Sequence, residues 1–180
     1  LSVPGEARGE VIFGSLYVQP SLAPPHGSSQ LSLGAELYGP FQKGRGGPGG
    51  WWFLSANALR LGPHILSPDL AGWRRERMPV LPSTAHVETP PDWICEVLSP
   101  STEGMDRGAK RRIYATYGVR HLWYLHPVER YLEVWTLRDG AWLHVDTFDD
   151  AQDFRAPPFD AVAFRLADLW PIPPASPSKP

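Results

Sequence analysis

The seven residues 93–99, WICEVLS, constrain the fold of this chain more than any other segment. Successive side chains of a strand point to opposite faces, so Ile94, Glu96 and Leu98 share one face and the residues between them share the other. Both faces are otherwise apolar, which is typical of a strand covered on both sides. The segment therefore predicts a central strand in a layered fold, with one carboxylate inside it.

Further strand patterns surround this segment. Residues 10–18, with Gly14-Ser15 in the middle, indicate a hairpin, and residues 131–137 and 141–148 indicate another about Asp139-Gly140. Shorter apolar or alternating runs predict strands at residues 51–54, 65–70, 121–125 and 162–166.

Two segments have helical spacing. The first, residues 26–37, has Ser28 or Ser29 as a candidate cap and Gly39-Pro40 as its stop; the second, residues 106–117, ends at Gly118. We expect an α/β (α+β) fold, in which helices flank a mixed central β-sheet with added N- and C-terminal β-hairpins. Residues 1–170 are expected to form a single domain, and residues 171–180 a loose Pro-rich tail.

Composition excludes several classes of protein. The net charge of −2 argues against a protein that coats nucleic acid by bulk charge. Cys95 is the only cysteine, so an internal disulfide is impossible, which fits a reducing compartment. The sequence has no apolar run of membrane-spanning length and no recognisable signal peptide. We therefore expect a cytoplasmic protein without a membrane partner.

Glu96 is the most informative single residue. A carboxylate within an apolar strand is costly unless it is paired, hydrogen-bonded, protonated or bound to a metal. Two interpretations stay open at this point: a structural ion pair with an Arg or Lys, and a functional site. Asp69 follows Pro68 at the end of an apolar run, where Pro-Asp alone indicates only a turn.

The combination of these residues suggests chemistry. An Asp and a Glu on two strands can meet and form the hard-oxygen site that Mg²⁺ or Mn²⁺ prefers, and the main-chain carbonyl of Val97 could complete it. Lys110 lies in the next predicted helix, with Tyr114 on the same face. A Lys beside a metal-bound water could orient the nucleophile or stabilise the transition state, although a helical Lys alone is usually a surface charge.

The ordered set of these residues resembles the Uma-two family of putative restriction endonucleases, a branch of the PD-(D/E)XK nuclease superfamily. The similarity extends over most of the chain, and its most specific part is the Glu-Val-Leu-Ser-Pro-Ser run with Lys and Tyr downstream. The matching residues are Glu10, His26, residues 68–74 and 96–102, Asp106, Lys110, Tyr114, Gly118-Val119 and residues 159–170.

The resemblance implies a metal-dependent endonuclease that hydrolyses phosphodiester bonds of nucleic acid, DNA above all, with Mg²⁺ or Mn²⁺ as cofactor. It implies Asp69 and Glu96 as metal ligands. Leu98 stands where the family's usual motif has Lys, and the resemblance places that Lys on the helix, at Lys110. Glu36 could be the additional acid that some members of the superfamily carry, and Tyr114 a second auxiliary residue. The chain departs from the expected pattern at Ala58 and His64, where we expect acids.

The alternatives come from other classes of protein. The chain could be a catalytically inactive nuclease-fold module for nucleic-acid binding or oligomerisation, and an edge strand could pair with a second copy in a homodimer. The six histidines form no HExxH pair, which argues against structural zinc. The arginine-rich stretches at residues 74–77 and 107–112 are most simply a solvated face, and the tryptophans at strand positions are most simply core residues.

Overall fold

The computed structural model describes residues 8–19, 23–149 and 153–171. Its centre is a six-stranded sheet in the order β10-β9-β8-β7-β6-β3. Neighbours β7 and β8 run parallel and the other neighbours run antiparallel, so the sheet is mixed, as predicted. Its strands are β3 (Trp51–Ser55), β6 (Leu70–Arg74), β7 (Trp93–Val97), β8 (His121–His126), β9 (Tyr131–Arg138) and β10 (Ala141–Asp149).

A smaller sheet has the order β2-β1-β5-β4 and contains the predicted N-terminal hairpin. The turn of this hairpin is Phe13-Gly14, one residue earlier than expected, and both residues have positive φ (49° and 79°). Positive φ at both central residues suits the right-handed twist of the flanking strands. The strands are β1 (Arg8–Ile12), β2 (Ser15–Gln19), β4 (Leu59–Leu61) and β5 (His64–Leu66).

The single strand predicted over residues 65–70 is wrong, because this segment divides between the two sheets. Strand β5 ends at Leu66 and β6 begins at Leu70. The connection between them contains Pro68, which has no N–H to donate to a sheet. Asp69 therefore lies at the exit of a connection, immediately before β6 in the central sheet.

The first helix is longer than predicted at both ends. Helix α1 (Pro24–Leu37) begins two residues early, and neither Ser28 nor Ser29 caps it, because its N-cap is Ala23 without a side-chain hydrogen bond. Proline is tolerated in the first turn, where the missing N–H has no partner within the helix. The expected stop at Gly39-Pro40 lies inside a π-helical turn, η1 (Tyr38–Gln42), that extends the helix.

The second predicted helix is present but irregular. It consists of α2 (Glu103–Met105), the π-helical turn η2 (Asp106–Lys110) and α3 (Arg111–Thr116). Gly118, with φ of 72°, follows its end, as predicted. Asp139 and Gly140 form the turn between β9 and β10, again with positive φ.

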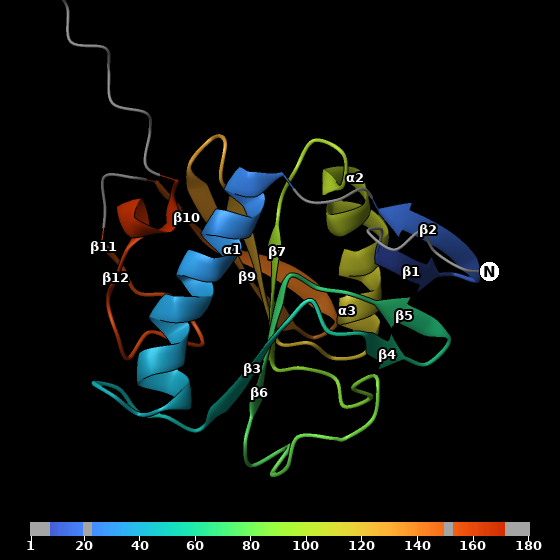
Figure 1. Cartoon of the computed structure of the whole chain (residues 1–180), viewed down its shortest axis with the longest axis horizontal. Helices are drawn as coiled ribbons and strands as arrows, with labels where there is room; N and C mark the ends of the chain where they lie inside the picture. Colours follow the sequence, from blue (N-terminus) through green and yellow to red (C-terminus); the bar gives the residue numbers. More distant parts are fainter. Residues whose placement is uncertain (1–7, 20–22, 150–152, 172–180) are drawn as a thin grey trace, which may run out of the picture.

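Helices cover both faces of the central sheet (Figure 1). Helix α1 lies on one face with β11 (Asp153–Phe154) and β12 (Phe164–Arg165), and α2, α3 and the smaller sheet lie on the other. The predicted last edge strand is thus shorter than residues 162–166, because Leu166–Leu169 form a 3₁₀ helix, η3. The predicted tail lies outside the described residues except for Pro171, and the domain limits stay a prediction.

The alternation predicted for residues 93–98 is confirmed. Trp93, Cys95 and Val97 belong to the core on the α1 side, and Ile94 and Leu98 belong to the core on the α3 side. Trp51, Trp73 and Trp123 are also buried, which confirms core packing for them, and Trp52 is partly buried against the α3-side core. Among the described residues, no helix has the length and hydrophobicity needed to cross a membrane.

Candidate active site

Glu96 is the centre of a buried polar cluster on the α3 side of β7. Its side chain is only 1% exposed. Its Oε1 atom accepts a hydrogen bond from the Tyr114 hydroxyl at 2.5 Å and lies 2.8 Å from the Lys110 ammonium. Lys110 and Tyr114 reach the same oxygen because residues four apart share a helix face. The sequence therefore predicted correctly which side chains share this face.

Asp69 lies beside Glu96 because β6 and β7 are neighbours. Asp69 Oδ2 accepts the main-chain N–H of Val97 at 2.9 Å, and the N–H of Asp69 points to Glu96 Oε2 at 3.4 Å. The N–H and C=O of a strand residue point to the same edge, so the Val97 carbonyl also lies on the Asp69 side. Asp69, the Glu96 side chain and the Val97 main chain thus lie together at this edge of β7, and their role as a metal site stays a prediction.

Lys110 is enclosed by carboxylates. Its ammonium lies 2.8 Å from Glu96, 2.9 Å from Asp106 and 3.4 Å from Glu10, and the side chain is 3% exposed. Asp106 precedes Lys110 by one turn of η2, and its main-chain carbonyl accepts the Tyr124 hydroxyl at 3.0 Å. An ammonium has three hydrogens, so these three acceptors match its full donor capacity.

Two further residues hold Asp69 from α1. His26 Nε2 lies 3.0 Å from Asp69 Oδ1, and Gln30 Nε2 donates to the Asp69 carbonyl at 2.7 Å. Among the described residues, His26 Nδ1 is buried without a hydrogen-bond partner. The His26 proton that serves this contact is therefore on Nε2, since an unprotonated Nε2 would oppose the carboxylate oxygen. Helix α1 fixes the connection that carries Asp69.

The charges of the cluster do not balance. Glu10, Asp69, Glu96 and Asp106 are all buried around Lys110. Burial, together with the neighbouring carboxylates, raises the pKa of Glu96 to about 8 against the opposing effect of Lys110. Burial likewise raises the pKa of Asp106. Burial lowers the pKa of Lys110, but Glu96 and its neighbours raise it well above its usual value, so Lys110 stays charged.

This donor set fits a divalent cation. Carboxylate and carbonyl oxygens are the ligands that Mg²⁺ prefers, and a cation would offset the excess negative charge. In the part of the chain that the structure describes, no three His, Cys, Asp or Glu side chains form a ready-made metal cage. An ion here would therefore rely on main-chain and water oxygens beside the two carboxylates.

The acids near Lys110 differ from the one that the sequence suggested. Glu36 is exposed on α1, ten residues after His26, or about 15 Å along the helix axis. The acids that approach Lys110 are instead Glu10 and Asp106, which the sequence comparison matched without giving them a role. The i,i+4 spacing between Asp106 and Lys110 could have predicted this contact, because residues four apart share a helix face.

Of the two departures from the family pattern, His64 has a local explanation and Ala58 has none. His64 is buried and accepts the Phe13 N–H through Nδ1 at 3.2 Å, so it fixes the turn of the N-terminal hairpin. The carbonyl of Ala58 accepts the Val87 N–H at 2.9 Å, which any residue at this position could do.

The arginine-rich stretches are occupied by structural contacts. Arg74 and Arg75 lie over the rings of Trp51 and Trp52, at 4.7 and 4.1 Å from the ring centres. Arg107 forms two contacts of 2.8 Å with Glu133. These partners reduce the number of arginines that are available to a nucleic acid without rearrangement.

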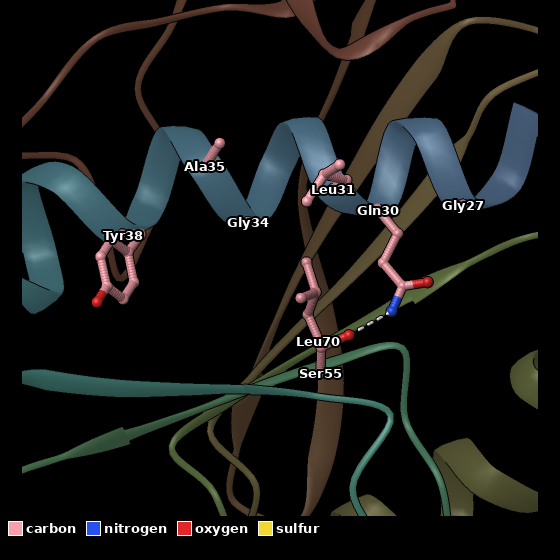
Figure 2. A pocket seen from close by; sticks show the side chains of 8 residues that line it. All are labelled: Gly27, Gln30, Leu31, Gly34, Ala35, Tyr38, Ser55 and Leu70. Atoms are coloured by element: carbon pink, nitrogen blue, oxygen red, sulfur yellow. Dashed lines mark hydrogen bonds between the residues drawn. The ribbon is translucent and has the colours of Figure 1, made fainter.

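A groove runs beside α1 close to Asp69. Figure 2 shows Gln30 reaching from the helix to Ser55, beside Leu70, while the remaining lining residues lie along the helix. The groove has a volume of about 530 Å³, and its lining is mostly apolar. The lining residues are Gly27, Gln30, Leu31, Gly34, Ala35, Tyr38, Ser55 and Leu70. Gln30 thus belongs both to the groove and to the contacts that hold Asp69.

Comparisons with known proteins agree with the resemblance. The model of the Uma2 (Uma-two) family, described as "Putative restriction endonuclease", matches residues 2–167. No match is found among curated proteins. The solved structure of a putative nuclease belonging to DUF820 from Anabaena variabilis ATCC 29413 is 19% identical, with a TM-score of 0.73. It covers 89% of this chain, and the match spans 88% of that protein. This likeness confirms the predicted fold class, and the family match confirms the resemblance.

Proposed function

Because the chain belongs to the Uma2 family of putative restriction endonucleases, we propose that it is a metal-dependent endonuclease that hydrolyses phosphodiester bonds. Nucleic acid, and DNA in particular, is the expected substrate. The observation that carries the proposal is the proximity of Asp69, just before β6, to Glu96 on β7: the Asp69 N–H points to Glu96 Oε2 at 3.4 Å, and Lys110 lies 2.8 Å from Glu96 Oε1. An acid pair beside an ammonium supplies both a cation site and a donor for a phosphate oxygen.

The residues that would hold the metal are Asp69, Glu96 and the carbonyl of Val97, with Mg²⁺ or Mn²⁺ as the ion. A bound divalent ion supplies an activated water and neutralises the charge that develops on the phosphate. Tyr114 and Lys110 both engage Glu96 Oε1, which leaves Oε2 on the side of Asp69. Tyr114 therefore acts as an auxiliary that orients the carboxylate.

Lys110 is proposed to donate to the scissile phosphate. All three of its hydrogens face carboxylates, so one contact is exchanged when a phosphate oxygen arrives. The contact to Glu10 is the longest of the three, at 3.4 Å, and it is the most readily exchanged. Glu96 and Asp106 then keep the ammonium in place.

One observation favours a second candidate function. A buried Glu96–Lys110 ion pair is also what a purely structural role predicts, and it would suit a catalytically inactive module that binds nucleic acid or oligomerises. The homodimer expected from an edge strand belongs to this candidate as well, and it can be measured by the mass of the protein in solution. Glu36 is exposed on α1, away from the cluster, and is proposed only as an auxiliary acid.

The deciding experiment is a cleavage assay. Supercoiled plasmid, linear duplex, single-stranded DNA and RNA are incubated with Mg²⁺, with Mn²⁺ and with EDTA. We expect metal-dependent cleavage that EDTA stops, and a rise of the melting temperature with millimolar Mn²⁺, since an ion that binds the folded form stabilises it. Glu96→Gln, purified identically, controls for contaminating nucleases. Nucleic-acid binding without cleavage, together with a melting temperature that Mn²⁺ leaves unchanged, would favour the inactive module.

A further inference from the structure

One carboxylate oxygen contacts both halves of the candidate site. Glu10 Oε1 accepts the main-chain N–H of Ser67 at 2.7 Å and lies 3.4 Å from the Lys110 ammonium. Glu10 comes from β1 in the smaller sheet, and its side chain is buried. A single atom of the N-terminal hairpin thereby contacts both the segment before Asp69 and the side chain of Lys110.

The main-chain N–H groups of the connection at residues 67–69 are directed to side chains, while the Asp69 carbonyl also accepts the main-chain N–H of Ala56 at 3.2 Å. The connection lies between β5 and β6, outside the regular pairing of either strand. The N–H of Ser67 goes to Glu10, the N–H of Asp69 points to Glu96, and Pro68 has none. Each main-chain donor of the connection is thus directed to a carboxylate of the cluster. Where Asp69 lies is therefore set partly by Glu10.

We propose that Glu10 is a positioning residue that couples the Asp69 connection to Lys110. This inference rests on the proposed function, because it assigns Glu10 a role toward the metal ligand and toward the phosphate donor of that site. Two properties of Glu10 carry the two roles. Its oxygen, as an acceptor for Ser67, sets the position of Asp69, and its negative charge holds Lys110 in place until a phosphate oxygen takes over that contact.

Substitutions separate these properties. Glu10→Gln keeps an oxygen that can accept the Ser67 N–H but removes the charge. Glu10→Ala removes both the acceptor and the charge. Asp106→Asn weakens another carboxylate contact of Lys110, at 2.9 Å, without touching the Asp69 connection. Glu103→Gln is the matched control, because Glu103 lies on the same helical segment and pairs with Arg107 rather than Lys110.

The test combines Mn²⁺ affinity, measured by calorimetry on the folded proteins, with cleavage kinetics. Residues that orient metal ligands typically account for about 10- to 100-fold in affinity or activity. We expect Glu10→Ala to weaken Mn²⁺ binding by about tenfold or more, whereas Glu10→Gln and Asp106→Asn stay within about threefold of the parent. All three should lower kcat by about tenfold or more, and Glu103→Gln should match the parent in both measurements.

The outcomes distinguish this inference from the proposed function. If the parent protein binds no Mn²⁺, the proposed function fails and the role of Glu10 fails with it, before any variant is compared. If the parent binds Mn²⁺ but Glu10→Gln loses as much affinity as Glu10→Ala, the separation of the two roles is wrong. Parental Mn²⁺ affinity in Glu10→Ala would equally overturn the inference. Should Glu10→Ala fail to fold, Glu10→Gln decides the matter alone, through reduced kcat at retained Mn²⁺ affinity.

Discussion

Both faces of the central sheet pack against an apolar core, but the α3 side also covers a buried charged cluster. On the α1 side, Trp93 and Trp123 pack edge-to-face at 5.4 Å within an apolar, aromatic core. On the α3 side, the same strands cover a buried cluster of carboxylates around Lys110. Burial of apolar area stabilises a fold, while buried charges cost free energy unless they are compensated. The apolar packing of the α1 side therefore helps to offset the free-energy cost of burying the polar cluster on the α3 side.

The largest effect should come from breaking the apolar side. Trp93→Ala removes a fully buried ring that also contacts Phe53 and Phe159. We expect the free energy of unfolding to fall by about 3–5 kcal/mol. Chemical denaturation measures this change. The folded fraction should retain the Mn²⁺ affinity of the parent, because no atom of Trp93 is in the polar cluster; a parallel loss of Mn²⁺ binding would show that the two sides are not separable.

The next effect concerns function on the charged side. Lys110→Met keeps the length of the side chain but removes the ammonium, and we expect cleavage to fall by about 10²–10³-fold, the usual loss for one preorganised donor. Metal affinity should be retained or rise slightly, because a nearby positive charge is gone. Kinetics and calorimetry on the same preparation test both statements.

Stability adds a second measurement to this variant. Without Lys110, the carboxylates around it lose their shared cation, so the metal-free protein should be destabilised by about 3–5 kcal/mol and Mn²⁺ should recover part of the loss. Cleavage at the parental rate would remove Lys110 from the mechanism and leave it a structural ion-pair partner.

A smaller effect, on the pH dependence of stability, should come from His121 on β8. Burial lowers the pKa of His121 to about 4, and Arg74 adds to this shift. Because the folded pKa lies below the unfolded value of about 6.5, this contribution to stability is present above pH 6.5 and is lost as the pH falls toward 4. His121→Gln should reduce the loss between these pH values by roughly 1–2 kcal/mol, since the ring is partly exposed. Melting temperatures across that range would contradict the assignment if both proteins change in parallel.

The smallest effect is expected at the rim of the charged side. Glu103 and Arg107 form a partly exposed pair at 2.6 Å, one helical turn apart. Glu103→Gln should lower the free energy of unfolding by less than about 0.5 kcal/mol, because exposed pairs are screened by solvent. Denaturation at low and high salt checks this value. A loss comparable to that of Lys110→Met would mean that the rim and the buried cluster form one network.

Local sequence patterns predicted much of this architecture. The period of two in residues 93–98 assigned side chains to the correct faces, and the positions of Gly118 and Asp139-Gly140 identified a helix end and a hairpin turn. Helical spacing also predicted that Lys110 and Tyr114 share a face, and both contact Glu96 Oε1. These features depend on neighbours within a few residues, which the order of the amino acids specifies directly.

Several local predictions failed where tertiary contacts outweighed propensity. Residues 65–70 resemble one strand but divide between two sheets, because Leu66 and Leu70 pack in different cores. The segment at Gly39-Pro40 resembles a helix stop but continues as a π-helical turn that buries Phe41. In each case burial against distant segments decided the backbone conformation.

The sequence by itself determined that Glu96 would be buried in a central strand and that Lys110 and Tyr114 would share a helix face. Only the tertiary structure decided that Glu10 and His26 join them, since their contacts span 57 residues to Ser67 and 43 residues to Asp69. No periodicity connects segments so far apart. Their meeting depends on which strands pair and which helix covers which face, and these are properties of the whole packed chain.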